Sequence, residues 1–167
     1  SVPIVDRIAA LGIQHVDYRE VGSETDVKRI LADAKANGTT YDEVFIAGHG
    51  TQNSLALGGY DRAKLETPAI KDDLYVDFSD FDDGDFDFAA VLKKGGRLID
   101  LSCSNGEGAD KADNLANRFS TTLTRDQTVV ASQVPTNITY MDKDPSGHIH
   151  VYWMGNTPYL VQGQKSE

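Results

Sequence analysis

Cysteine is almost absent from this chain, because Cys103 is the only one among its 167 residues. A lone thiol cannot form an internal disulfide, so disulfides do not hold this fold together. The sequence also lacks any apolar run close to the roughly 20 residues that a membrane-spanning helix needs. Hydrophobic residues make up 40% of the chain and charged residues 25%, which indicates one globular, soluble domain over residues 1–167.

Basic residues are also scarce: 16 Lys and Arg face 26 Asp and Glu, which gives a net charge of −10. Nucleic-acid binding needs a cationic face that displaces counterions, so the composition argues against nucleic acid as a partner. Much of the acidity falls in one stretch, at Asp72, Asp73, Asp77, Asp80, Asp82, Asp83, Asp85 and Asp87. The aromatic residues between them predict a loop anchored by its rings, with its carboxylates in water.

Apolar spacing and turn residues predict alternating helices and strands along most of the chain. Ser23 is a candidate N-cap, with Asp26 three residues later. We expect helices over 5–11, 24–37, 89–94 and 112–123. We expect strands over 13–21, 44–47, 54–57, 98–101, 129–132 and 157–161, and a β-hairpin formed by 138–141 and 148–153. The rest of 51–88 is predicted to be irregular.

This order of elements predicts an α/β fold, in which a mostly parallel central sheet is flanked by helices and joined by right-handed crossovers. The β-hairpin makes residues 136–167 an extension of this single domain. Because the chain opens on a predicted helix, a first strand for the sheet would come from a segment ahead of Ser1 or from elsewhere in the fold.

Two of the predicted strands end in side chains that can do chemistry together. The apolar run 44–47 is followed by Gly48-His49-Gly50, and the run 98–101 is followed by Ser102-Cys103-Ser104-Asn105-Gly106. An imidazole beside a thiol can take its proton and later protonate a leaving amine. Backbone amides beside the two residues can stabilise the oxyanion that develops. The pattern therefore indicates a cysteine nucleophile with a histidine base.

The segments 44–50 and 98–106 together resemble the caspase-like cysteine peptidases, which include caspases, metacaspases, gingipains, separase and the self-processing domains of bacterial toxins. The resemblance covers roughly residues 13–135, and it implies a three-layer fold, a peptide or protein substrate and no cofactor. By position, it makes His49 the general base and Cys103 the nucleophile of a dyad at the carboxyl edge of the sheet. It also implies an oxyanion hole formed by Gly50 and the amide of Cys103.

Departures from the family pattern bear on specificity and on regulation. Leu101 stands where metacaspases carry an aspartate that binds a basic side chain, so arginine or lysine specificity is not supported. The wall of the specificity pocket is expected at Ser132, Gln133 and Val134. The hairpin resembles extra β-elements of the toxin domains, which implies secretion as part of a larger bacterial protein. Inositol hexakisphosphate, which switches on those domains through a basic pocket, fits this acidic chain poorly.

Two other functions are compatible with the same residues. A catalytically silent caspase-like module would use the acidic loop to recruit calcium or a basic partner, although the aspartate spacing does not match a helix–loop–helix calcium loop. A different hydrolase would pair Cys103 with His148 or His150, but Leu101 and Asn105 occupy the glycine positions of that motif.

The remaining ionisable residues give weaker predictions. His148 and His150 have the spacing of metal ligands, but the sequence offers no third ligand near them, so we expect them to face solvent and predict no metal site. Asp17, on the strand predicted ahead of the His49 strand, is the candidate that would orient His49.

Overall fold

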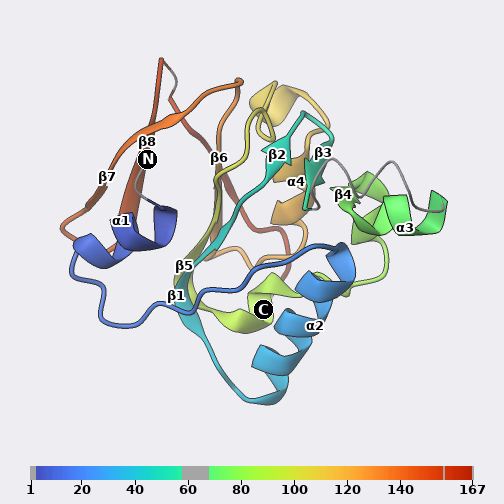
Figure 1. Cartoon of the computed structure of the whole chain (residues 1–167), viewed down its shortest axis with the longest axis horizontal. Coiled ribbons are helices and arrows are strands. Elements are labelled where there is room, and N and C mark those ends of the chain that lie inside the picture. The colour runs from blue at the N-terminus through green and yellow to red at the C-terminus, as the bar shows by residue number, and fades with distance from the viewer. Residues whose placement is uncertain (1–2, 58–67, 156, 167) are drawn as a thin grey trace.

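The computed structural model describes residues 3–57, 68–155 and 157–166. A four-stranded sheet with the order β1-β5-β6-β9 lies at its centre (Figure 1). Its strands are β1 (Tyr41–Ile46), β5 (Leu92–Asp100), β6 (Thr128–Ala131) and β9 (Tyr159–Gln162). β5 pairs in parallel with β1 on one side and β6 on the other, and β9 pairs antiparallel with β6. The sheet is therefore mixed and mostly parallel, which confirms the α/β prediction.

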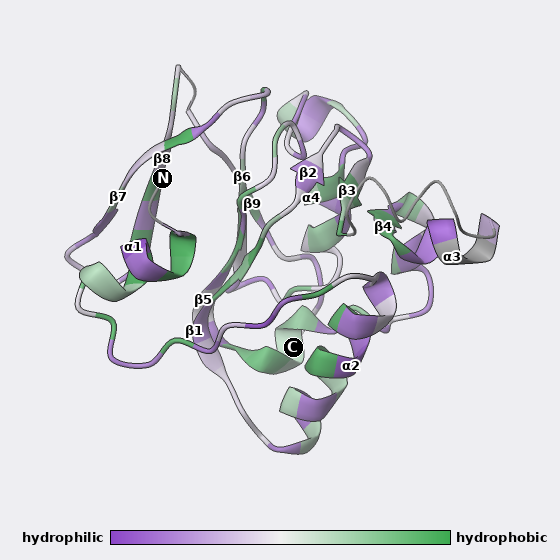
Figure 2. Ribbon diagram, in the orientation of Figure 1, coloured by the Kyte–Doolittle hydropathy of each residue, from purple (hydrophilic) through white to green (hydrophobic). Residues whose placement is uncertain are grey.

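Each face of this sheet packs against a different layer. Helices α2 (Glu24–Ala36) and α4 (Leu115–Ser120) share one apolar cluster with Leu98 and Val129 of the sheet. Ile99 and Val130, the next residue along each strand, join a second cluster with α1 (Ile4–Ala10) and the C-terminal hairpin. Successive side chains of a strand point to opposite faces, so these near-continuous apolar strands fill both layers. Figure 2 shows hydrophobic residues along the central strands and a mixed surface on α2.

The predicted start of α2 is confirmed in detail. The Ser23 hydroxyl accepts a hydrogen bond of 3.1 Å from the Asp26 amide, which satisfies one of the free N–H groups of the first turn. The Asp26 carboxylate in turn accepts from the Gly22 amide at 2.9 Å. The N-cap pattern in the sequence thus predicts the start of α2 correctly.

The predicted C-terminal hairpin is also confirmed. Strands β7 (Ile138–Lys143) and β8 (Ile149–Trp153) pair antiparallel. The inward residues of β8 are Ile149, Val151 and Trp153, which are buried against the sheet. The strand predicted after the hairpin is β9, which leaves the hairpin and joins the central sheet.

Two predicted elements are wrong. Residues 13–21 form no strand, because they cross the surface from α1 to α2 with Val16 and Tyr18 exposed and no neighbouring strand to pair with (Figure 1). The predicted helix over 89–94 is only a 3₁₀ turn, η3 (Phe88–Val91), and Lys93 and Lys94 already belong to β5. Gly95 has φ +73° and sits where the β1–β5 register shifts, so the glycine pair makes an irregularity within the strand instead of ending a helix.

The strand predicted over 54–57 is confirmed over Ser54–Ala56. Regular elements also occur in the rest of 51–88, which the sequence predicts to be irregular. β2 (His49–Gly50), β3 (Ser54–Ala56) and β4 (Tyr75–Asp77) form a small antiparallel sheet in the order β2-β3-β4. The helix α3 (Pro68–Asp73) precedes β4, and a 3₁₀ turn, η2 (Phe78–Phe81), follows it. A further turn, η4 (Ala109–Lys111), precedes α4. In the part of the chain that the structure describes, no helix has the length and apolarity that membrane crossing requires.

Candidate active site

The central sheet brings the two candidate catalytic residues to one edge. In the β1–β5 pair, Ile46 lies opposite Asp100, so both strands end at the same level. His49 follows β1 after two residues, and Cys103 follows β5 after two residues. Parallel neighbouring strands present their carboxyl ends together, which is where ligands bind in open α/β sheets.

The backbone of the histidine segment lies directly against the cysteine segment. A Cβ atom added to Gly50 would lie 2.4 Å from the carbonyl oxygen of Cys103 and 2.9 Å from the Cβ atom of Ser102. Only glycine leaves room for this approach. The residue after His49 is therefore in contact with the residue that carries the thiol.

A single cavity of about 260 Å³ lies beside both candidate catalytic residues. It is lined by His49, Gly50, Thr51, Ser54, Ala56, Tyr75 and Cys103. His49 is exposed and Cys103 is half-buried, so both side chains can meet a ligand from solvent. The small sheet β2-β3-β4 supplies the other walls. Sequence reasoning missed Tyr75 and Ala56, because their place depends on strand pairing between distant segments, which no local motif records.

The thiol of Cys103 donates a hydrogen bond of 3.4 Å to the carbonyl oxygen of Thr136. Ser104, the next residue, has φ +57°, a conformation that is uncommon for residues other than glycine. The chain therefore turns sharply at the nucleophile position. Such strained backbone is characteristic of sites that must present one side chain.

The three predicted substrate-binding residues lie beside the segment 101–114, which joins β5 to α4 and carries Cys103 (the cysteine loop). The Gly106 amide donates to the Ser132 carbonyl at 2.8 Å, and the Ser104 amide donates to the Val134 carbonyl at 3.3 Å. Ser132 is buried, and its hydroxyl bonds to the Val134 carbonyl at 2.8 Å. Gln133 donates to the Thr157 carbonyl at 3.2 Å. Val134 is 41% exposed and is the most accessible of the three.

Asp100 is a fully buried carboxyl three residues before Cys103. Its Oδ1 atom accepts a hydrogen bond of 2.9 Å from the Ser102 amide, while its Oδ2 atom and the Ser102 hydroxyl are buried without a hydrogen-bond partner. Burial disfavours the charged form and raises the pKa of Asp100 to about 7, although the bond from Ser102 opposes this shift. The cysteine loop is thus anchored by a carboxyl that is partly neutral near neutral pH.

The side chains of the other candidate residues, Asp17, His148 and His150, contact groups that do not line the Cys103 cavity. Asp17 accepts a hydrogen bond of 2.5 Å from the Tyr41 hydroxyl and lies 3.2 Å from His15, and the bond from Tyr41 lowers the pKa of its carboxyl. His148 Nδ1 lies 3.1 Å from Glu43, and His150 Nδ1 lies 3.9 Å from Asp142. Both histidines belong to the hairpin region, whereas His49 is the histidine that lines the Cys103 cavity.

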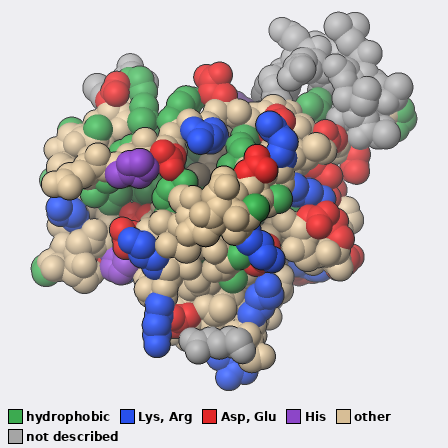
Figure 3. Space-filling model, turned by 90° about the horizontal axis from the view of Figure 1, so that it is seen from below, with side chains coloured by type: hydrophobic (Ala, Val, Ile, Leu, Met, Phe, Trp, Pro, Cys, Tyr) green, Lys and Arg blue, Asp and Glu red, His purple; other side chains and the backbone are tan. Residues whose placement is uncertain are grey.

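A second cavity, also of about 260 Å³, lies between the central sheet and the hairpin. Its polar lining is provided by Arg97, Asp144 and His150, and its remaining walls are apolar. Arg97 lies 3.9 Å from Asp144, so its charge is partly balanced. On the face seen in Figure 3, Lys and Arg side chains are interspersed with Asp and Glu.

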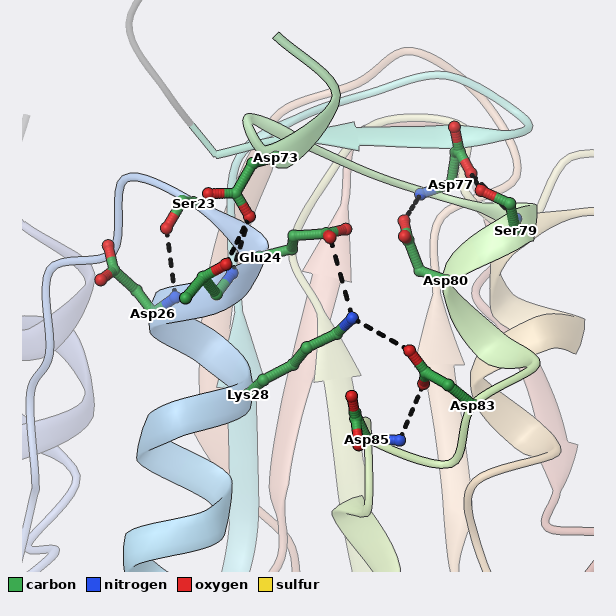
Figure 4. Close-up of polar contacts among 11 residues, drawn as sticks. Ser23, Glu24, Asp26, Lys28, Asp73, Asp77, Ser79, Asp80, Asp83 and Asp85 are labelled. Atoms are coloured by element: carbon green, nitrogen blue, oxygen red, sulfur yellow. Dashed lines mark hydrogen bonds and ion pairs between the residues drawn. The ribbon is translucent and has the colours of Figure 1, made fainter. Parts of the chain in front are cut away.

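The acidic stretch packs on α2 through its own side chains (Figure 4). Lys28 lies 3.7 Å from Glu24 and 3.3 Å from Asp83. Burial and the neighbouring Asp80 raise the pKa of Glu24 to about 8. Phe86 and Phe88 anchor the loop in the core as predicted, with a stacked contact between them and an edge contact from Phe88 to Phe119. Two residues depart from the prediction: Tyr75 is exposed, and Asp80 is buried, where its carboxylate accepts from the Asp77 amide at 2.7 Å. Among residues 3–57, 68–155 and 157–166, no group of three or more His, Cys, Asp and Glu is placed to hold a metal ion.

Comparison of the chain with protein-family models, with curated proteins and with solved structures found no significant match.

Proposed function

We propose that this protein is a cysteine endopeptidase that hydrolyses peptide bonds with a His49–Cys103 dyad. The observation that carries the proposal is the shared cavity, which both residues line from the ends of neighbouring parallel strands. The contact between Gly50 and the Cys103 carbonyl adds to it, because it brings the backbone of the two segments together at the same point.

In the proposed reaction, the imidazole of His49 takes the proton of the Cys103 thiol, and the thiolate attacks the carbonyl carbon of the scissile bond. The amides of Gly50 and Cys103 stabilise the oxyanion. His49 then gives its proton to the leaving amine, and the C–N bond breaks to leave a thioester on Cys103. Water hydrolyses the thioester, which releases the acid and restores the thiol.

The same proposal includes the three-layer caspase-like fold and a substrate strand alongside Ser132, Gln133 and Val134. The parallel order β1-β5-β6 supports it, since β1 leads to the histidine and β5 to the cysteine. Val134 is exposed next to the cysteine loop, which gives an extended peptide a surface to lie on.

A peptide-library assay with single variants tests the activity. Wild type and His148→Ala should cleave the library, whereas Cys103→Ala should not, and His49→Ala should be slower by about 100-fold or more, the contribution expected of a general base. His148→Ala is the matched control, and it also tests the alternative hydrolase. Equal cleavage by wild type and Cys103→Ala would refute the proposal.

One observation favours a second candidate function, a catalytically silent module of the same fold. The Cys103 thiol is bonded to the Thr136 carbonyl, which engages it with the chain itself. If this arrangement persists in solution, iodoacetamide should fail to modify Cys103 in the folded protein while modifying it fully after denaturation in urea. Rapid modification of the folded protein would exclude this candidate.

A further inference from the structure

The side chain of Asn105 connects the cysteine loop to residues 51–54, the turn that follows His49 between β2 and β3 (the histidine turn). Asn105 is fully buried, and its Nδ2 atom donates to the carbonyl oxygens of Thr51 at 2.5 Å and Ser54 at 3.0 Å. Both partners are carbonyl oxygens, which only accept, so the amide nitrogen has to point toward them. One side chain thus makes two bonds between segments that are more than 50 positions apart in the sequence.

The two carbonyls that Asn105 binds are the ends of the turn that joins β2 to β3. The Thr51 amide donates to the Ser54 carbonyl at 3.0 Å and closes this turn. His49 lies two residues before Thr51, in a strand of only two residues. Because so short a strand has few bonds of its own, the position of His49 depends on how the turn is held.

Two further hydrogen bonds hold the same turn. The Leu115 amide donates to the Gln52 carbonyl at 2.8 Å, and Gln52 Nε2 donates to the Glu107 carbonyl at 3.3 Å. The backbone carbonyl of Asn105 also accepts a hydrogen bond of 2.9 Å from the Ala116 amide. Asn105 therefore lies where the histidine turn, the cysteine loop and the first turn of α4 meet.

We propose that Asn105 is a positioning residue, which docks the β2–β3 turn on the cysteine loop and so sets the geometry between His49 and Cys103. The inference rests on the proposed function, since it assigns Asn105 a role in that dyad. Asn105 touches neither a substrate nor the reacting atoms in this scheme. Without its amide, the Thr51 carbonyl loses the Asn105 donor and the Ser54 carbonyl keeps only the Thr51 amide, so the turn that follows His49 is held less tightly on the cysteine loop.

Alkylation of Cys103 by iodoacetamide tests this without a known substrate. Rates are measured at about pH 6.5 and about pH 9.5, on either side of the roughly 8.5 at which an ordinary thiol ionises. If the His49 imidazole is held beside the Cys103 thiol, it takes the thiol proton and keeps the sulfur reactive at the lower pH. We expect Asn105→Ala to react about tenfold more slowly than wild type at the lower pH, as His49→Ala does, and at a similar rate at the higher pH.

Asn114 provides the matched control. It is also fully buried, and its Nδ2 atom also donates to two carbonyls, those of Glu107 at 3.1 Å and Ala109 at 2.9 Å. Neither bond is made to the histidine turn itself, and the link to that turn is indirect, through the Glu107 carbonyl that also accepts from Gln52. Asn114→Ala should therefore lose stability and keep the wild-type ratio of the two rates.

The outcomes separate the inference from the proposed function. If His49→Ala keeps the wild-type ratio, the dyad itself is wrong. If His49→Ala lowers the ratio but Asn105→Ala does not, or if Asn114→Ala lowers it equally, the positioning role is overturned. Should Asn105→Ala not fold by circular dichroism, Asn105→Ser takes its place, and an unchanged ratio in that folded variant overturns the role.

Discussion

At the scale of single residues, Asp100 makes stability depend on pH. Its pKa is raised to about 7 by burial, against roughly 3.9 in the unfolded chain. Between these values the folded protein binds more protons than the unfolded one. The contribution of Asp100 to stability is therefore fully present below about pH 4, falls as pH rises toward 7, and is constant above that.

Asp100→Asn should remove this dependence, because the amide oxygen still accepts from Ser102 and the side chain cannot ionise. We expect wild type to lose stability relative to the variant as pH rises from about 4 to about 7. The difference in their free energies of unfolding should change by about 1.4 kcal/mol per pH unit. Urea unfolding at several values from pH 5 to pH 8 measures it.

The exposed Asp113 is the control for this experiment. The hydrogen bond from Arg118 lowers the pKa of Asp113, so its contribution is lost only under acid conditions. The difference between wild type and Asp113→Asn should be constant from pH 5 to pH 8. A difference for Asp100→Asn that is equally constant would mean that Asp100 ionises normally.

Gly50→Ala tests the close approach of the two segments. The added Cβ atom meets the backbone carbonyl of Cys103, which cannot rotate away, so we expect a loss of about 1–3 kcal/mol in stability and loss of Cys103 labelling by a peptide-based electrophile. Gly147→Ala is the comparison. It has φ +90° in an open turn and should cost about 1–2 kcal/mol without affecting labelling. Equal labelling in both variants contradicts the account.

The sequence reveals His49 and Cys103 because each follows an apolar strand and is flanked by small residues. It gives no such signal for Tyr75, which reaches the cavity through pairing with Ala56. It also gives none for Asn105, whose partners are backbone carbonyls and leave no trace in residue type. Local patterns thus predict the candidate reacting groups, whereas the residues around them depend on the tertiary structure.

At the scale of elements, Lys28 joins α2 to the acidic loop (Figure 4). Its removal in Lys28→Met leaves Glu24 and Asp83 without their cation, and we expect a cost of about 1–2 kcal/mol. Because the pKa of Glu24 is about 8, the cost should be larger at pH 9 than at pH 6. Chemical denaturation at both pH values measures it.

Lys35→Met is the control for this prediction. Lys35 pairs with Asp87, but its side chain is 62% exposed, so solvent screens the pair and the cost should be about 0–1 kcal/mol. If Lys28→Met costs no more than Lys35→Met at either pH, the acidic loop does not depend on its ion pair with Lys28.

Glu43 attaches the hairpin to the central sheet. Its Oε1 atom accepts from the Ile149 amide at 2.7 Å and lies 3.1 Å from His148 Nδ1, and burial raises its pKa. Glu43→Ala should cost about 1–3 kcal/mol and speed hydrogen exchange in β7 and β8. Glu43→Gln keeps an acceptor for the amide and should show a smaller effect. Unchanged exchange in Glu43→Ala would show that apolar packing alone holds the hairpin.

Helices and strands are predictable from the sequence where a cap or a pattern of apolar residues marks them locally. They are not predictable where their formation depends on a neighbouring strand. The N-cap at Ser23 and the alternation of β8 were sufficient for α2 and the hairpin. Residues 13–21 alternate as well, but no strand lies beside them, so they cross the surface unpaired. The helix predicted over 89–94 would end at Gly95-Gly96, whereas this glycine pair lies inside β5.

At the scale of the whole molecule, the parallel order β1-β5-β6 places two strand ends, and therefore His49 and Cys103, at one edge of the sheet. That arrangement follows from the alternation of helices and strands in the sequence, since right-handed crossovers bring successive strands together in parallel. We propose that Cys103 attacks a peptide carbonyl at this edge.

Trapping of an acyl-enzyme tests the attack by Cys103. The protein is mixed with a library of activated peptide esters, quenched in acid and digested, and its fragments are identified by mass spectrometry. We predict a thioester on Cys103 in wild type and a much weaker one in His49→Ala. The absence of an acyl group on Cys103, or acylation of His49→Ala as fast as wild type, would contradict the proposed dyad.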